Sequence, residues 1–333
     1  MARVSRGFSL VFTGGDAVLA ESGSTRTRTD LVPATGDYVV INNDPEDGTN
    51  IHAIAPRRTS LARRAPGRVP EAQVLAANID MVFVMHGLDR PLNLRRIERQ
   101  LVVAWDSGAT PVVVLTKADT IEDETELDQT VASVDNVSPG VTTLAVSTVS
   151  GVGVAEIEAM ITVGKTVALM GLSGVGKSTL VNLLSGGQVQ RTGEVRATDH
   201  RGRHTTVTRD LIPIPGRGHI IDTPGIREIG LWQAYDGMNK TFVEIAKAAA
   251  GCRFADCDHD QEPGCGVQDG LANGTISQRR LDHWRDLMAE LELQDSQLEE
   301  FSRRAESRDR AEAHRKRDKE RPNTRSRKGR RRD

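Results

Sequence analysis

Apolar runs of about three to six residues alternate with amphipathic stretches of helical period through the middle of the chain. Continuous Val, Ile and Leu runs of this length, separated by helices, are typical of parallel strands that are buried on both faces. The pattern therefore predicts an α/β domain over residues 73–232, with a mostly parallel sheet between two layers of helices. The runs that carry this prediction are MVFVM, PVVVL, TTLAV, KTVALM, DLIPI and HII.

Residues 1–60 follow a different pattern, in which short apolar segments are separated by turns. The turn at 35–37 (Thr-Gly-Asp), for example, directly precedes the run YVVI. Short strands joined by such turns predict a small β-barrel. Residues 61–72 contain Arg, Pro and Gly without apolar periodicity, and we expect a linker there.

The C-terminal third is predicted to be helical at first and then disordered. Residues 233–300 contain a helical pattern at 241–251, three cysteines, and a long charged helix within 277–300. Residues 301–333 form a basic tail: from 302 onward there are 15 Lys or Arg against 6 Asp or Glu. A segment this charged cannot bury enough apolar surface to fold alone, so we expect it to be disordered. Its arginines favour contact with a polyanion such as RNA, and a solubilising tail is the alternative.

Composition limits the class of protein. A chain of 333 residues with 38% hydrophobic residues is long enough for two or three globular domains. It contains no apolar run of the length that a bilayer requires, and its first residues lack the features of a signal peptide. We therefore expect a cytoplasmic protein without a membrane segment, in which clustered cysteines indicate a metal rather than disulfides.

The most specific motif is GLSGVGKS at 171–178, which follows the apolar run KTVALM and precedes a helical pattern. Backbone N–H groups of such a loop, together with the positive end of the helix, surround nucleotide phosphates. Lys177 would reach the β- and γ-phosphates and Ser178 would hold Mg²⁺. A glycine-rich turn that merely matches the motif is the alternative. The predicted contacts are Gly171, Leu172, Ser173, Gly174, Val175, Gly176, Lys177, Ser178 and Thr179.

The base is predicted by TKAD at 116–119. Guanine offers two adjacent N–H donors, which the carboxylate of Asp119 can accept together, whereas adenine lacks that pair. An ATP-dependent enzyme with the same loop is therefore the less favoured reading. We assign base contacts to Thr116, Lys117, Ala118 and Asp119, and to Ser147 and Thr148 of the later segment AVSTVSG.

A second phosphate element, DTPG at 222–225, follows the run HII. Asp222 would act on Mg²⁺ and the Gly225 N–H on the γ-phosphate. Thr205 and Thr206 are equal candidates for a further Mg²⁺ ligand. These are the signatures of a Ras-like GTPase in a permuted order, because the base motifs precede the phosphate loop. Opening the chain after DTPG would let hydrolysis move the C-terminal domain.

Cys252, Cys257, His259 and Cys265 have the spacing C-x4-C-x-H-x5-C. Three thiolates and an imidazole make a closed tetrahedral site that favours one structural Zn²⁺. Three free cysteines beside a surface histidine are the alternative.

On these motifs the chain resembles the ribosome small subunit-dependent GTPase A family, the circularly permuted GTPases of small ribosomal subunit biogenesis. The resemblance implies an N-terminal OB-fold barrel that binds RNA, a permuted Ras-like GTPase domain and a C-terminal zinc-binding helical domain. It implies a monomer that binds the 30S subunit and its rRNA, and that hydrolyses GTP late in assembly when the ribosome stimulates it. A module that binds rRNA and uses GTP mainly as a structural ligand is the alternative.

Three residues change the chemistry expected of a classical GTPase. Thr116 stands where the family motif begins with Asn, so one tethering hydrogen bond should be kept and a second lost. Ile226 stands where classical GTPases carry a water-positioning Gln, so unstimulated hydrolysis should be slow. The resemblance implies that His204 takes over this catalytic task, whereas a histidine that contacts only RNA or solvent is the alternative.

Overall fold

The computed structural model describes residues 1–5, 7–14, 16–21, 31–44, 48–65, 72–187, 209–222 and 230–320, with the backbone alone at 309 and 312–320. Its strands are β1 (Arg3–Val4), β2 (Phe8–Thr13), β3 (Asp16–Glu21), β4 (Val39–Asp44), β5 (Gly48–Ile54), β6 (Ser60–Arg64), β7 (Ala72–Ala77), β8 (Met81–Gly87), β9 (Thr110–Thr116), β10 (Thr142–Val146), β11 (Thr166–Gly171), β12 (Asp210–Pro213) and β13 (His219–Asp222). Its α-helices are α1 (Leu94–Asp106), α2 (Glu124–Asp135), α3 (Val154–Met160), α4 (Lys177–Ser185), α5 (Tyr235–Thr241), α6 (Val243–Ala249), α7 (Gly266–Ala272) and α8 (Gln278–Glu320).

The central sheet is arranged around β11, with the order β10-β9-β8-β11-β13-β12. The three strands on one side of β11 come before it in the chain, and the two on the other side come after it. Neighbouring strands from β10 to β13 are parallel. All five therefore end at the same edge of the sheet, although the chain visits them in a permuted order.

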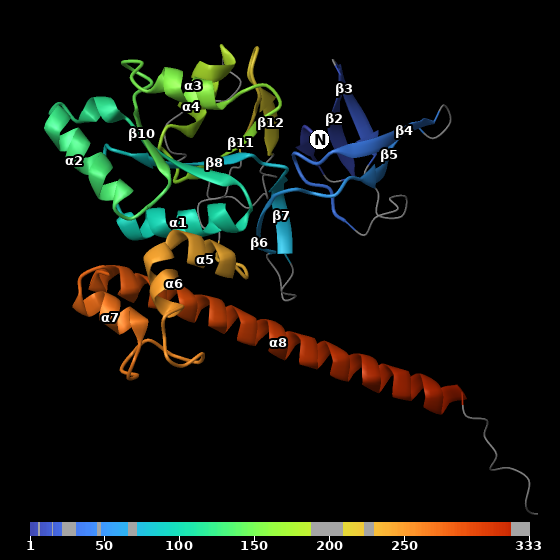
Figure 1. The fold of residues 1–333 in the computed structure, drawn as a ribbon. Helices are drawn as coiled ribbons and strands as arrows, with labels where there is room; N and C mark the ends of the chain where they lie inside the picture. Colours follow the sequence, from blue (N-terminus) through green and yellow to red (C-terminus); the bar gives the residue numbers. More distant parts are fainter. Residues whose placement is uncertain are drawn as a thin grey trace, which may run out of the picture.

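Helices cover both faces of this sheet (Figure 1). α1 and α2 contribute to the apolar core on one face, and α3 and α4 contribute to the core on the other. The predicted α/β architecture is thus confirmed. The exception to parallel pairing is β12, which runs antiparallel to β13 because the connection at 214–218 is a hairpin turn, far too short for a parallel crossover.

The N-terminal strands form a barrel-like unit that pairs in the order β1-β2-β3-β5-β4. Val11, Ala20, Ile51 and Ile54 form its small buried core. β1 also pairs antiparallel with β12, so hydrogen bonding is continuous from the barrel-like unit into the central sheet. The predicted β-rich N-terminal unit is confirmed as a set of barrel-like strands.

The expected linker at 61–72 is partly wrong, because residues 61–64 belong to β6. This strand pairs antiparallel with β7 in a separate two-stranded sheet. Leu61 and Leu75 are almost completely buried and belong to the core that includes α1. One buried leucine is enough to anchor β6 on the core, because its partner strand β7 supplies the rest of the apolar surface.

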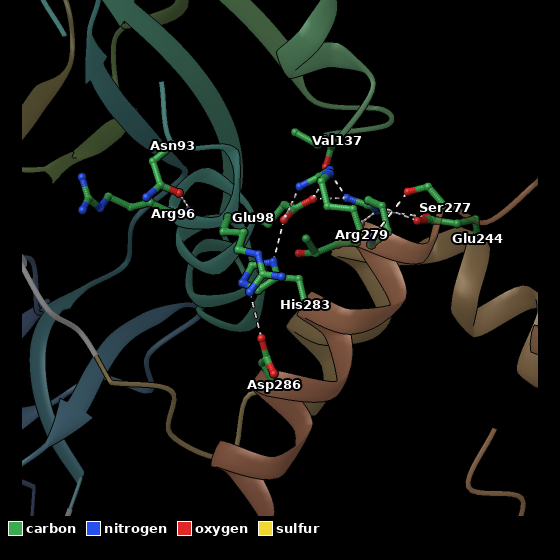
Figure 2. Close-up of polar contacts among 12 residues, drawn as sticks. Asn93, Arg96, Glu98, Val137, Glu244, Ser277, Arg279, His283 and Asp286 are labelled. Carbon is green, nitrogen blue, oxygen red and sulfur yellow. Dashed lines mark hydrogen bonds and ion pairs between the residues drawn. The ribbon is translucent and has the colours of Figure 1, made fainter. Parts of the chain in front are cut away.

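A buried carboxylate joins the helical domain to the central domain (Figure 2). Glu98 on α1 is fully buried and contacts three basic side chains of α8. Arg279 and Arg280 each lie 3.0 Å from its Oε1, and His283 Nδ1 lies 2.5 Å from its Oε2. Burial alone would raise the pKa of Glu98, but the His283 contact and the two arginines hold it below the ordinary value.

Arg280 extends this contact to three other parts of the chain. Its guanidinium also bonds the Glu244 carboxylate on α6, the Thr241 carbonyl at 2.9 Å and the Val137 carbonyl at 2.8 Å. The ring of Phe242, which is fully buried, lies 4.7 Å from the guanidinium carbon. Since Phe242 and the buried part of α8 share one apolar core with the central sheet, the helical domain is packed as part of the same body.

The expectation of a disordered segment from 301 onward is wrong as far as residue 320, because α8 continues to Glu320. Ion pairs at i,i+4 support the exposed helix, namely Glu299–Arg303, Glu300–Arg304 and Glu306–Arg310. The helix is already nucleated by its packed first turns, so propagation into a segment of good helix formers is inexpensive. Within the described chain, none of the helices has the length and apolar character to cross a bilayer.

We predict that Glu98→Gln destabilises the fold by about 1–3 kcal/mol, because buried Arg280 keeps only Glu244 as a carboxylate partner and the hydrogen bonds to Glu98 lose their charged acceptor. The free energy of unfolding in urea measures this loss. Glu299→Gln is the control, since it removes a carboxylate from an exposed pair on α8 and should change stability by less than about 0.5 kcal/mol. Equal losses in the two variants would contradict the role given to Glu98.

Candidate nucleotide-binding site and metal centre

The predicted nucleotide motifs meet at the carboxyl edge of the central sheet. β9 ends at Thr116 of the base motif, β10 ends directly before Ser147, and β11 ends at Gly171 of the phosphate loop. Parallel strands bring their carboxyl ends to one edge, where ligands of α/β proteins commonly bind. The structure thus brings together three motifs that are separated by up to 62 positions in the chain.

The phosphate loop has the backbone that its glycines predict. A Cβ on Gly171 would lie 2.5 Å from the Met85 carbonyl oxygen, so the neighbouring strand leaves no room for a side chain. Gly176 caps α4 with φ +92°, a left-handed conformation that favours glycine. Lys177 Nζ lies 2.7 Å from each of the Gly171 and Leu172 carbonyls, inside the curve of the loop.

Thr116 fastens the base motif to the phosphate loop. Its buried hydroxyl lies 2.6 Å from the Val175 carbonyl and 3.2 Å from the His86 carbonyl. A hydroxyl has one proton to donate, so we assign the hydrogen bond to the shorter contact with the Val175 carbonyl. The longer contact with the His86 carbonyl is not a second full hydrogen bond. The Leu88 N–H donates to the Thr116 carbonyl in return. The expected single tether is therefore present.

Asp119 is held by the neighbouring loop. Its carboxylate is exposed in a single 3₁₀ turn, Ala118–Thr120, and the Ser147 hydroxyl donates to its Oδ1 at 2.5 Å. Ser147 is fully buried and accepts from the backbone N–H groups of Val149 and Ser150. The rigid serine thereby fixes the direction of the carboxylate at the sheet edge.

The remaining predicted residues divide into two groups. Asp222 ends β13 and is in register with Leu169 of β11, next to the phosphate loop. Ser178 and Thr148 are half-buried and Thr179 is exposed at the same edge. The predicted Gly225, His204, Thr205 and Thr206 lie outside the described residues.

Sequence analysis missed two charged residues at this edge. Asp89 and Arg90 follow β8, and Asp89 Oδ2 lies 2.7 Å from Lys117 Nζ. Arg90 lies 3.3 Å from the same Asp89 oxygen and close to Gly174 of the phosphate loop. The rule that identified TKAD, a charged residue directly after a buried strand, would also have identified this pair.

The four predicted metal ligands come together in the helical domain. Their ligand atoms all lie within 4.8 Å of one another. His259 Nδ1 lies 3.5 Å from Cys252 Sγ and 3.6 Å from Cys265 Sγ, and these two sulfurs are 3.9 Å apart. A tetrahedral zinc with ordinary bond lengths separates its nitrogen and sulfur ligands by about 3.5 to 3.8 Å. The donor set and its spacing therefore fit one zinc ion.

The surrounding chain positions His259 for this purpose. Its backbone carbonyl accepts from Gln268 at 2.7 Å and from Arg285 at 2.6 Å, and its ring lies against Trp284. Burial lowers the pKa of His259, which favours the neutral imidazole that a metal requires. Two helices of the helical domain, α7 and α8, thus converge on one ligand.

A cavity of about 260 Å³ lies elsewhere, between β6, the end of α1 and residues 230–234. Its lining includes Asp106, whose pKa burial raises to about 6. The lining contains no residue of the nucleotide motifs, so this cavity is separate from the candidate site.

Comparisons with known proteins give the family. The sequence model of the family described as "RsgA GTPase" matches residues 54–232, more than half of the chain, and a model described as "50S ribosome-binding GTPase" matches 166–305. The chain is 44% identical over 289 residues to a Small ribosomal subunit biogenesis GTPase RsgA of Streptomyces avermitilis, covering 86% of this chain and 78% of that protein. The chain belongs to the RsgA GTPase family. As a member it is a GTPase, which hydrolyses GTP with Mg²⁺.

Other relatives agree with this assignment. A protein of the same description from Lactiplantibacillus plantarum, RsgA 2, is 44% identical over 262 residues, covering 79% of this chain and 73% of that protein. The crystal structure of YjeQ from Thermotoga maritima matches with a TM-score of 0.62 and 26% identity, covering 83% of this chain and 91% of that one. YloQ, described as a circularly permuted GTPase, has the same TM-score at 22% identity, covering 87% of this chain and 93% of that one, and supports the permuted fold.

We predict that Thr116→Val weakens GDP binding roughly three- to tenfold, because it removes the tether and leaves the buried Val175 carbonyl without it. Thr116→Ser is the matched control, since it keeps the hydroxyl and should bind GDP nearly as the parent does. Titration with a fluorescent GDP analogue measures both. Parent-like affinity in Thr116→Val would show that the tether does not support the site.

We predict one zinc ion per chain, lost in Cys257→Ser together with the fold of the segment around residues 252–277, since metal binding and folding are coupled in such sites. Elemental analysis gives the metal content, and limited proteolysis reports the local fold. Asp256→Asn, which alters an exposed neighbour, should retain the ion. A parent protein without zinc would refute the assignment.

Proposed function

We propose that this chain binds the small (30S) ribosomal subunit late in its assembly and hydrolyses GTP when that particle stimulates it. Similarity to relatives named small ribosomal subunit biogenesis GTPases, at 44% identity over most of the chain, carries this proposal. The meeting of a phosphate loop and an Asp119 base motif at one sheet edge supports it independently. The barrel-like N-terminal unit, read as an OB-fold over residues 1–60, is the proposed RNA-binding domain.

In this proposal the sheet edge binds GTP through three groups of contacts. Lys177 would exchange the loop carbonyls for the β- and γ-phosphates, and Ser178 and Asp222 would hold the Mg²⁺ ion, which neutralises phosphate charge. The Asp119 carboxylate accepts the paired N–H donors of guanine, in the direction that Ser147 fixes. The stem of Lys117 lies along the base plane. GDP lacks the γ-phosphate, which in this proposal both Lys177 and the Gly225 N–H of the DTPG segment would contact.

Hydrolysis needs a group that positions water, and we propose His204 for that task. One of Thr205 and Thr206 would complete the Mg²⁺ shell beside it. Because Ile226 replaces a water-positioning side chain, turnover should stay slow until the ribosome stimulates it.

The helical domain and its extension complete the proposed partner surface. Zn²⁺ at Cys252, Cys257, His259 and Cys265 would stabilise the domain, and the arginine-rich residues from 301 onward would contact rRNA. In this proposal the protein acts as a monomer in the cytoplasm, where ribosomes are assembled.

The proposal predicts low GTP hydrolysis alone and a rise of at least tenfold with purified small subunits. Phosphate release with and without the particle measures this. His204→Ala should keep GTP affinity and lose the stimulation. Equal hydrolysis with and without the particle would contradict the proposed function.

Two controls separate the alternatives. Lys177→Ala should abolish hydrolysis and prevent release from the subunit, whereas unchanged release would favour a binding module that uses GTP structurally. ATP should not displace labelled GDP, and effective displacement would contradict the role of Asp119.

A further inference from the structure

The charged residues that follow β8 form a structured contact with the base motif. Lys117 Nζ lies 2.7 Å from Asp89 Oδ2, and Arg90 lies 3.3 Å from the same oxygen. We propose that Asp89 is a positioning residue for guanine nucleotides, which holds Lys117 extended across the base site. The inference rests on the proposed placement of guanine beside Lys117 and Asp119.

Lys117 leaves β9 through an unusual backbone conformation. Its φ is +58°, in the left-handed region that L residues adopt rarely. This turn directs the next residues into the 3₁₀ turn that presents Asp119. The long stem of Lys117 then passes Gly87, where a Cβ would lie 3.8 Å from Lys117 Cδ. A fixed ammonium end therefore keeps the stem flat along this edge.

Asp89 is itself well anchored. The preceding residue, Leu88, donates its N–H to the Thr116 carbonyl at 2.9 Å, so the Asp89 backbone is tied to the start of the base motif. A Cβ on Gly87 would lie 2.5 Å from Asp89 Oδ1, so glycine makes room for the folded-back carboxylate. Hydrogen bonds from Lys117 and Arg90 lower the pKa of Asp89, which keeps it ionised at neutral pH.

The contact is compatible with a bound nucleotide. An ammonium has three N–H donors, and the Asp89 bond uses one of them. The others can reach a ribose oxygen or a loop carbonyl while the stem covers the base. Lys117 would thus arrive at the site already extended, which reduces the side-chain entropy that binding must remove.

The expected size of the effect is modest, because both side chains are about one third exposed (34% and 30%). Pairs of this kind correspond to roughly two- to fivefold in an equilibrium constant. The direction of the change in GDP affinity distinguishes a positioning role from a purely electrostatic one. Removing a negative charge near an anionic nucleotide should by simple electrostatics strengthen binding, whereas loss of positioning weakens it.

The test is a double-mutant cycle on GDP dissociation, measured with a fluorescent GDP analogue on the full chain. Asp89→Asn should speed GDP release roughly two- to fivefold. In Lys117→Met, which keeps the stem and removes the ammonium, the same substitution should change release by less than about 1.5-fold. Glu158→Gln is the matched control, because the Glu158–Arg217 pair has similar length and exposure but lies away from the nucleotide motifs.

The outcomes separate this inference from the proposed function. Unchanged or slower release in Asp89→Asn, or an equal acceleration in the Lys117→Met background, would overturn the positioning role. Asp119→Asn tests the base site itself and should weaken GDP binding far more than Asp89→Asn. If Asp119→Asn binds GDP normally, the placement of guanine fails; if it does not and Asp89→Asn is silent, only the present inference fails.

Discussion

The site depends on the register of parallel strands around β11. Gly171 lies opposite Met85 of β8, and Leu169 lies opposite Asp222 of β13, so the phosphate loop is flanked by two strands whose carboxyl ends lie at the same edge of the sheet. The same register can form whatever the order of the strands along the chain. A permuted chain can therefore build a GTPase site, provided that each motif still follows the strand it belongs to. The Thr116–Val175 contact then fastens the base half to the phosphate half.

Much of the site could be predicted because its chemistry is local. A glycine-rich loop between a buried strand and a helix, and a carboxylate that follows another buried strand, can be recognised from short stretches of sequence. The cysteine cluster is also local, since its four ligands fall within 14 residues and converge as predicted. Asp89 was missed although the same reasoning applied to it, because its partner Lys117 lies 28 positions away.

Long-range contacts explain most of what the sequence did not reveal. The partners of Glu98 lie 181 to 185 positions further along the chain, and neither α1 nor α8 contains a sequence motif from which this contact could be predicted. β6 was mistaken for a linker because its apolar face consists of few residues and is completed by β7 and α1. The extension of α8 was missed for a different reason. Low apolar content argues against a folded core, but it does not prevent a helix that begins on a packed domain from continuing into solvent.

Glu98 on α1 and its three basic partners on α8 (Arg279, Arg280 and His283) form a clamp between two domains. This clamp limits how the GTPase cycle can act on the helical domain. The chain runs from DTPG into that domain, which suggested that hydrolysis moves it. Separating α8 from α1 would, however, break the contacts between the Glu98 carboxylate and its three basic partners and expose a shared apolar core. The cost would be several kcal/mol. Nucleotide-dependent motion that keeps this contact must move α1 and α8 together. α1 begins only five residues after Asp89, with Asn93 as its N-cap, so Asp89 and the clamp lie on one continuous segment. Motion of the helical domain would therefore reach the proposed Asp89–Lys117 contact as well as the segment after DTPG.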